Sequence, residues 1–84
     1  DPNDPDVYIN RGNILSGMDE YERAAENYTE AIRMNPNYSE AYHNRGVMYH
    51  RLGLYEESEQ DLAKVAELNA ESEGDSTGGN GSSQ

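Results

Sequence analysis

The 84-residue chain has no cysteine, tryptophan or phenylalanine, and Lys64 is its only lysine. Without cysteine it can form neither a disulfide framework nor a thiolate metal site, and its redox compartment is undetermined. No apolar run approaches the length of a membrane span and no signal peptide is visible, which favours a cytoplasmic location without membrane association. Hydrophobic residues make up only 33% of the sequence, so it is one small domain at most, with little material for a core.

Acidic side chains outnumber basic ones by 17 to 6, which gives a formal net charge of −11. Phosphates would be repelled across most of such a surface, so the charge argues against binding nucleic acid. It favours a partner of basic character, or it keeps the protein soluble. Abundant acid with almost no lysine also fits adaptation to high salt.

Residue patterns typical of enzymes are missing from the sequence. No serine lies in a nucleophile motif, no glycine-rich loop is built to hold a phosphate, and no histidine–acid cluster has metal-ligand spacing. His43 and His50 are about 10 Å apart along a helix, too far to bind one ion. We therefore predict no enzyme activity, no catalytic residue, no cofactor and no metal site.

Helix start and stop signals predict four helices. Pro36 cannot continue a helix, whereas Asp4, Asp19 and Ser39 are typical N-caps and Gly53 suits a left-handed C-terminal residue. The predicted helices run from Pro5 to about Gly17, from Glu20 to Met34, from Ser39 to about Leu52, and from Leu54 or Tyr55 to about Leu68.

A 34-residue repeat organises the chain around the joint Asn35-Pro36-Asn37. Aligning residues 5–38 with 39–72 gives seven identities without a gap: Tyr8/Tyr42, Asn10/Asn44, Arg11/Arg45, Gly12/Gly46, Tyr21/Tyr55, Glu22/Glu56 and Asn35/Asn69. With helix–turn–helix units at this period, the sequence resembles the tetratricopeptide repeat (TPR) family. The matching residues are Tyr8, Gly12, Ala24, Tyr28, Ala31 and Pro36 in the first unit and Tyr42, Gly46, Tyr49, Leu62 and Val65 in the second.

Five residues depart from the family pattern. Arg11 and Arg45 replace leucine, Leu15 replaces the first tyrosine, Ser58 replaces the small alanine, and Ala70 replaces the closing proline. The resemblance implies an all-α fold in which two hairpins, residues 5–38 and 39–70, form a short right-handed superhelical solenoid fragment. Residues 1–4 would be the remnant of a preceding inter-repeat turn.

Each hairpin is expected to cross at a glycine, with Gly12 facing Ala24 and Gly46 facing Ser58, because close helices need small contacts. Large side chains, mostly tyrosines, would fill the space around these crossings. They are Tyr8, Leu15, Tyr21, Tyr28, Ile32 and Met34 in the first unit and Tyr42, Tyr49, Leu52, Tyr55, Leu62 and Val65 in the second.

The C-terminal segment differs in composition from the repeats. From Asn69 onward the chain has no large apolar residue, so residues 71–84 are predicted to be a flexible, disordered acidic and Gly/Ser-rich tail. The last predicted helix is more polar than its counterpart, as the C-terminal cap of a longer array would be. Two units are also fewer than the three a stable stack usually needs, which leaves self-association open.

In TPR proteins the first helix of each unit lines a groove that binds peptides, so the resemblance implies a protein–protein interaction module. The matching residues are Asp6, Ile9, Asn10, Asn13, Glu40, His43, Asn44, Val47 and His50. Asn13 and Asn44 match two asparagines of the family's carboxylate clamp, which holds the C-terminal carboxylate of a peptide. Ile9, however, stands where the clamp has a lysine, and the cations of a third unit are missing. We therefore reject a clamp. The alternative is a structural module whose main contact is with its own copies, as a homo-oligomer or an array end.

Overall fold

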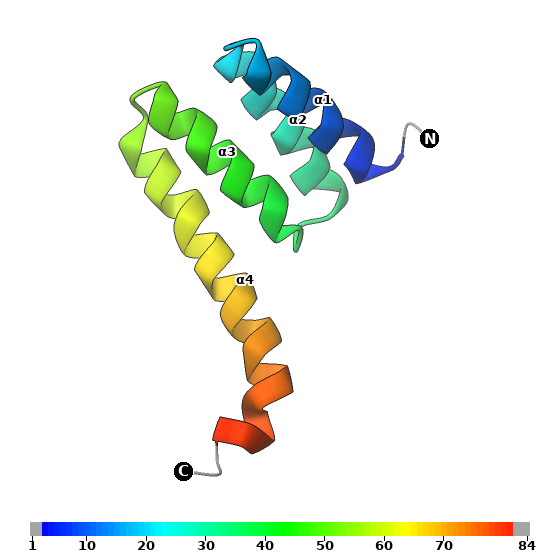
Figure 1. Ribbon diagram of the computed structural model, residues 1–84, viewed down its shortest axis with the longest axis vertical. Helices are drawn as coiled ribbons and strands as arrows, with labels where there is room; N and C mark the ends of the chain where they lie inside the picture. Colours follow the sequence, from blue (N-terminus) through cyan, green and yellow to red (C-terminus); the bar gives the residue numbers. More distant parts are fainter. Residues whose placement is uncertain (1–2, 82–84) are drawn as a thin grey trace.

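The computed structural model describes residues 3–81, with side chains described as far as residue 72, and it contains four α-helices. They are α1 (Pro5–Gly17), α2 (Tyr21–Met34), α3 (Ser39–Arg51) and α4 (Tyr55–Gly81). Each helix packs against the next one, so two hairpins lie side by side in chain order (Figure 1). The predicted all-α fold of two hairpins is confirmed, and residues 3–81 contain no strand. In that same stretch no helix is both long and apolar enough to cross a bilayer.

The helix starts agree with the prediction at α1 and α3 and differ by one residue at α2, whereas the capping residues differ at both α2 and α3. The Asp4 side chain accepts a hydrogen bond from the Asp6 N–H at 2.9 Å, which confirms Asp4 as the cap of α1. The predicted caps Asp19 and Ser39 are wrong, because the capping positions are Glu20 and Tyr38, neither with a side-chain cap. The Tyr38 carbonyl accepts the first helical bond of α3, from the Ala41 N–H at 3.0 Å, so Ser39 is already inside the helix.

The turns inside the two hairpins share one backbone feature. Asp19 has a φ of 62° and Gly53 a φ of 80°, and the two residues are 34 positions apart. Gly53 therefore has the predicted left-handed conformation, in which glycine meets no steric penalty. Asp19 adopts the same left-handed conformation although it is not a glycine. Its carboxylate accepts a hydrogen bond from the Tyr21 hydroxyl at 2.9 Å.

The core is built more from alanine than the sequence suggested. The buried apolar residues are Ile9, Ala24, Ala25, Tyr28, Ala31, Ala41 and Met48, with Tyr8, Leu15, Tyr21, Ile32, Tyr38, Val47 and Tyr49 partly buried against them. Tyr55 and Leu62 were predicted as core and are 58% and 42% exposed. Their counterparts on α2 are covered by α3, and among the described residues no helix covers α4 in the same way.

The glycine crossing in the first hairpin involves a different partner from the predicted one. A Cβ placed on Gly12 would lie 2.5 Å from Cε1 of Tyr28, so Gly12 faces the Tyr28 ring rather than Ala24. At Gly46 the nearest atom would be Cβ of Asp61 at 3.2 Å, not Ser58. Gly12 makes room for the residue sixteen positions later, and Gly46 makes room for the residues fifteen and sixteen positions later, Asp61 and Leu62. The approach of α1 to the Tyr28 ring is the closer of the two contacts.

The end predicted for the last helix, at about Leu68, is wrong because α4 continues to Gly81. Pro36 ends α2 one residue after its C-cap, whereas Ala70 occupies the equivalent position and favours helix. Figure 1 shows the last turns of α4 projecting beyond the other three helices. The flexibility predicted for residues 71–84 stays a prediction, and residues 82–84, like residues 1–2 of the predicted turn remnant, lie outside the described residues.

Candidate functional site: the face of α1 and α3

The nine predicted binding residues lie on α1 and α3, and eight of them reach the surface at least in part. Ile9 is the exception. It is 3% exposed and belongs to the core, so it cannot contact a partner and its assignment to the groove is wrong. Val47 is partly buried and packs against the same core. We call the remaining surface, formed by Asp6, Asn10, Asn13, Glu40, His43, Asn44, Val47 and His50, the α1–α3 face.

Asn13 and Asn44 meet at the middle of this face. The Asn44 side-chain amide donates to Oδ1 of Asn13 at 3.3 Å, and the Tyr28 hydroxyl donates to the same oxygen at 2.6 Å. Burial, followed by the charge of Glu40, raises the pKa of Tyr28 above its ordinary value, so this hydroxyl keeps its proton. Within residues 3–81 no hydrogen bond uses the Asn13 amide nitrogen, which leaves its two N–H groups as donors on an exposed side chain.

One end of the α1–α3 face is acidic. The Tyr38 hydroxyl donates to a carboxylate oxygen of Asp6 and so ties the joint between the units to α1. This hydrogen bond is the main cause that raises the pKa of Tyr38 to about 12, with smaller contributions from burial and from the charges of Asp6, Glu40 and Asp4. The three carboxylates thus make the potential negative at this end.

The histidines extend the face along α3. Nδ1 of His43 lies 3.3 Å from Oδ1 of Asn44, and the His50 ring meets the Tyr55 ring edge-on at a centroid distance of 5.0 Å. Asn10 is exposed on α1. Sequence reasoning missed Tyr28 and Tyr38 as supports of the face; the only signal for Tyr38 was its place directly after the joint.

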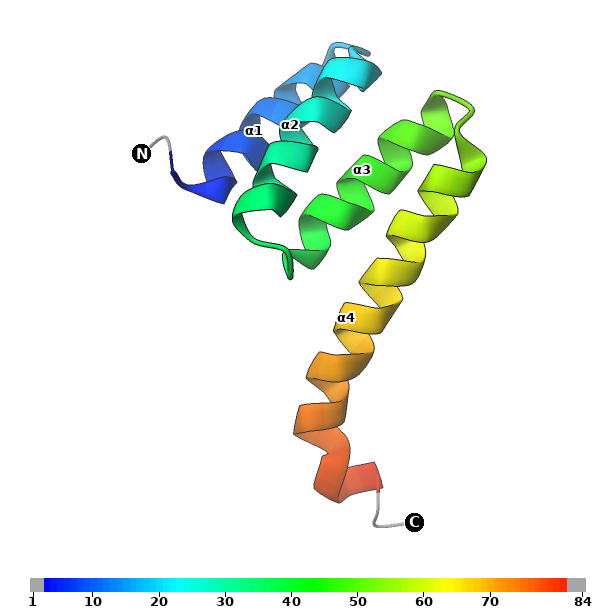
Figure 2. The same ribbon diagram turned by 180° about the vertical axis from the view of Figure 1, so that it is seen from behind.

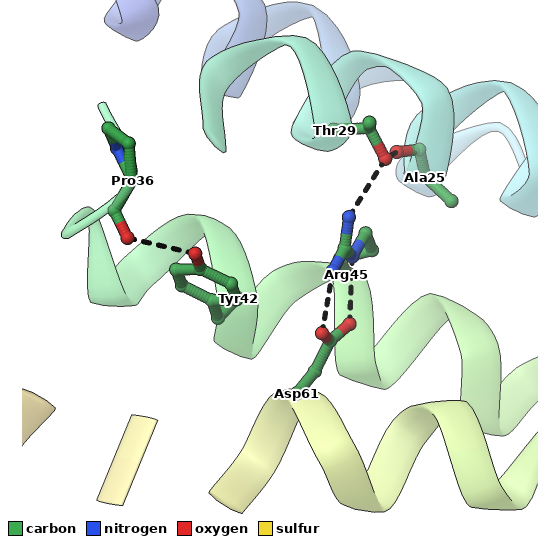
Figure 3. Close-up of polar contacts among 6 residues, drawn as sticks. All are labelled: Ala25, Thr29, Pro36, Tyr42, Arg45 and Asp61. Atoms are coloured by element: carbon green, nitrogen blue, oxygen red, sulfur yellow. Dashed lines mark hydrogen bonds and ion pairs between the residues drawn. The ribbon is translucent and has the colours of Figure 1, made fainter. Parts of the chain in front are cut away.

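Arg45 on α3 contacts both neighbouring helices, α2 and α4 (Figure 3). Its guanidinium donates to both carboxylate oxygens of Asp61 on α4, at 2.8 and 2.7 Å, and to Oγ1 of Thr29 on α2 at 3.1 Å. Thr29 in turn donates to the Ala25 carbonyl at 2.9 Å. The hydrogen bond to Asp61 raises the pKa of Arg45 further, against the lowering effect of burial.

A second contact holds the start of α3. The Tyr42 hydroxyl donates to the Pro36 carbonyl at 2.8 Å, which joins the first turns of α3 to the joint (Figure 3). Together with the Arg45 contacts, this bond sets the position of Asn44 relative to Asn13. The α1–α3 face therefore depends on the packing of the two units against each other.

Comparison with known proteins finds matches to TPR proteins. A family model described as TPR repeat matches residues 18–53, and one described as tetratricopeptide repeat matches residues 39–72. Hsp70-Hsp90 organizing protein 1 of Glycine max is 40% identical over 68 residues, which is 81% of this chain and 12% of that protein. A UDP-N-acetylglucosamine–peptide N-acetylglucosaminyltransferase of Giardia intestinalis is 38% identical over 61 residues, 73% of this chain and 4% of that protein. The chain thus spans only a small part of these relatives.

Two solved structures are similar in fold. The second TPR of Spaghetti (RPAP3), bound to the HSP90 peptide SRMEEVD, superposes with a TM-score of 0.78 at 31% identity, covering 81% of this chain and 63% of that one. MamA superposes with a TM-score of 0.82 at 26% identity, covering 86% of this chain and 42% of that one. Both similarities extend over both hairpins.

Proposed function

Because the chain belongs to the tetratricopeptide repeat family, we propose that it is a protein–protein interaction module whose α1–α3 face binds a peptide segment of a partner. The observation that carries this proposal is the Asn13–Asn44 pair. Oδ1 of Asn13 is already used by Tyr28 and Asn44, so the Asn13 amide is held with its donors available. The proposal assigns the chain no catalytic role.

The amide pair is suited to the backbone carbonyls of an extended peptide. A carboxylate clamp of the kind known in the family needs cations beside the asparagines, and Ile9, at the position of one of them, is buried. At the acidic end of the α1–α3 face, the carboxylates of Asp6 and Glu40 favour binding of a lysine or arginine side chain of the partner. We therefore propose a partner peptide of basic character, although one structural relative was solved with the acidic peptide SRMEEVD.

A matched pair of peptides tests this function: SRMEEVD and the variant in which both glutamates are lysine. Measured by calorimetry, the lysine peptide is expected to bind more tightly, and Asn13→Ala to weaken that binding about fivefold to tenfold, the worth of one hydrogen bond. Asn27→Ala, on α2 and outside the α1–α3 face, serves as the control and is expected to leave affinity unchanged. Tighter binding of SRMEEVD, or equal binding by wild type and Asn13→Ala, would contradict the proposal.

The alternative function, self-association, is favoured by a separate observation. Apolar side chains are exposed at both ends of the stack, among them Ile14 on α1 at 64% and Leu62 on α4 at 42%. Neither residue belongs to the α1–α3 face. A second function of the chain would therefore be contact with its own copies, through surfaces that leave the peptide-binding face open.

A further inference from the structure

One buried hydroxyl supports the α1–α3 face. Tyr28 lies on α2, which packs against both α1 and α3 (Figure 2), and it is only 1% exposed. Its hydroxyl donates to Oδ1 of Asn13 at 2.6 Å, and Asn13 itself is exposed on α1. A buried side chain of one helix thus holds a surface side chain of another.

The glycine at position 12 brings the Tyr28 ring to α1. A Cβ on Gly12 would lie 2.5 Å from Cε1 and 2.8 Å from Cζ of Tyr28, so a larger residue would push the ring away from α1. Because Cζ carries the hydroxyl, the same close approach brings the hydroxyl to Asn13, the next residue along α1. The hydrogen bond is therefore a consequence of how α1 packs on α2.

The second unit keeps this packing but lacks the polar pair. Two side-chain atoms of Leu62 would lie 3.4 Å from a Cβ on Gly46, so Leu62 lies against that glycine as Tyr28 lies against Gly12. The 34-residue period places Leu62 at the position of Tyr28 and Val47 at that of Asn13. An apolar side chain is thus compatible with the crossing, and the hydroxyl accompanies the asparagine that accepts its hydrogen bond.

Two donors meet at the Asn13 oxygen and determine the direction of its amide. Asn44 donates to this oxygen at 3.3 Å, so the contact from Tyr28 is the shorter of the two. If the amide turned round, its N–H groups would face the Asn44 amide N–H groups. The Tyr28 hydroxyl proton would also lose its acceptor, which is unfavourable for a buried donor. The observed orientation therefore directs the Asn13 N–H groups away from Tyr28 and Asn44.

We propose that Tyr28 is a positioning residue for peptide binding, whose hydroxyl holds the Asn13 side chain so that it offers hydrogen-bond donors to the partner. The site then selects an acceptor, such as a backbone carbonyl of the peptide, over a donor. Tyr28 is buried, so it acts through Asn13 and does not touch the peptide. The inference rests on the proposed peptide-binding function and adds the residue that determines the hydrogen-bonding polarity of the site.

The variant Tyr28→Phe removes the hydroxyl and keeps the ring against Gly12. The Asn13 side chain can then take other χ1 rotamers and both amide orientations, so it spends less time in the orientation that binds. If that orientation is kept for about a third of the time, the affinity falls by the same factor. Tyr21→Phe is the matched control on α2, because the Tyr21 hydroxyl donates to Asp19 instead, and it should leave the affinity unchanged.

Calorimetry with the lysine variant of SRMEEVD separates positioning from general support of the fold through a double-mutant cycle. Tyr28→Phe is expected to weaken binding about threefold in the wild-type background. It should have no further effect in the Asn13→Ala protein, since the side chain that it positions is gone. Circular dichroism checks that all variants keep their helices. Equal losses in both backgrounds would show a general structural role and overturn the proposal, as would wild-type affinity in Tyr28→Phe.

A second measurement needs no peptide. Nuclear magnetic resonance relaxation of the ¹⁵N-labelled protein gives the order parameter of the Asn13 side-chain amide. This parameter should be close to that of rigid backbone, about 0.85, in wild type and Tyr21→Phe, and fall below about 0.6 in Tyr28→Phe. An amide that stays equally ordered without the hydroxyl would overturn the proposal even where the peptide binds. A wild-type protein that binds neither peptide would instead contradict the proposed function, before any Tyr28 variant is measured.

Discussion

Arg45 and Asp61 form a bidentate ion pair between α3 and α4, with N–O distances of 2.8 and 2.7 Å. Their side chains are only 18% and 6% exposed. Arg45 also packs against the rings of Tyr42 and Tyr49, at 5.8 and 5.4 Å from their centroids. The same guanidinium donates to Thr29 on α2, so Arg45 also joins the second hairpin to the first.

Removing Asp61 is expected to be strongly destabilising. Asp61→Ala leaves the Arg45 charge largely buried without its partner, which should lower the free energy of unfolding by about 3 kcal/mol. The control is Glu30→Ala, which breaks the exposed pair with Arg33 and should cost less than about 0.5 kcal/mol. Urea denaturation followed by circular dichroism measures both values. Similar losses for the two variants would show that Arg45 does not depend on Asp61.

The two helical glycines should respond differently to alanine. Gly12→Ala forces a Cβ against the Tyr28 ring and should lower the free energy of unfolding by about 2 kcal/mol, as overpacking does. Gly46→Ala meets its nearest atom only at 3.2 Å, and the better helix propensity of alanine, about 1 kcal/mol, should offset the tighter contact. Thermal unfolding compares the two variants with wild type. A Gly12→Ala protein as stable as Gly46→Ala would contradict the close approach of α1 to Tyr28.

Stability should fall at high pH through Tyr38. The pKa of its hydroxyl is raised to about 12, so the contact with Asp6 stabilises the fold below pH 10 and is lost as the pH rises through 12. Tyr38→Phe should cost about 1 kcal/mol or less at pH 9, since solvent screens a partly exposed contact. The difference from wild type should vanish toward pH 12. Urea unfolding across this range measures it, and a difference that stays constant would contradict a role for the Tyr38 hydroxyl.

Shortening the chain after Ser72 should leave the free energy of unfolding within about 0.5 kcal/mol of wild type. The helical residues 73–81 include four glycines, each costing about 1 kcal/mol relative to alanine in a helix. Amide exchange in this segment should be close to that of an unfolded peptide. A loss above about 1 kcal/mol, or strongly protected amides, would show that the end of α4 supports the fold.

The repeat and the helix breaks could be predicted from the sequence because both are local or periodic. Pro36 stops a helix that approaches it from the N-terminal side, and the 34-residue identities fix equivalent positions without knowledge of the packing. The end of α4 was misjudged because the polar composition after Asn69 was given more weight than the alanine at position 70, where the first unit has Pro36. The caps of α2 and α3 were misjudged because residues of the right type, Asp19 and Ser39, stand next to the true capping positions.

Burial and the details of the site depended on packing that no single helix reveals. Ile9 lies three residues after Asp6 and four before Asn13, so helical spacing alone puts it on their face, yet it is buried. Leu62 has the pattern of a core residue and is exposed, because burial needs a helix on its outer side. Asn13 and Asn44 were singled out, but their hydrogen bond and the support from Tyr28 depend on how α1, α2 and α3 meet.

The peptide-binding role of the α1–α3 face is tested most directly by nuclear magnetic resonance of the ¹⁵N-labelled protein. The lysine variant of SRMEEVD is added, and the side-chain amide signals of Asn13 and Asn44 are followed. We predict that these two signals shift most, together with backbone amides of α1 and α3, while those of Asn27 and Asn69 stay in place. Unmoved signals for Asn13 and Asn44 at saturating peptide, or shifts confined to α4, would contradict this role.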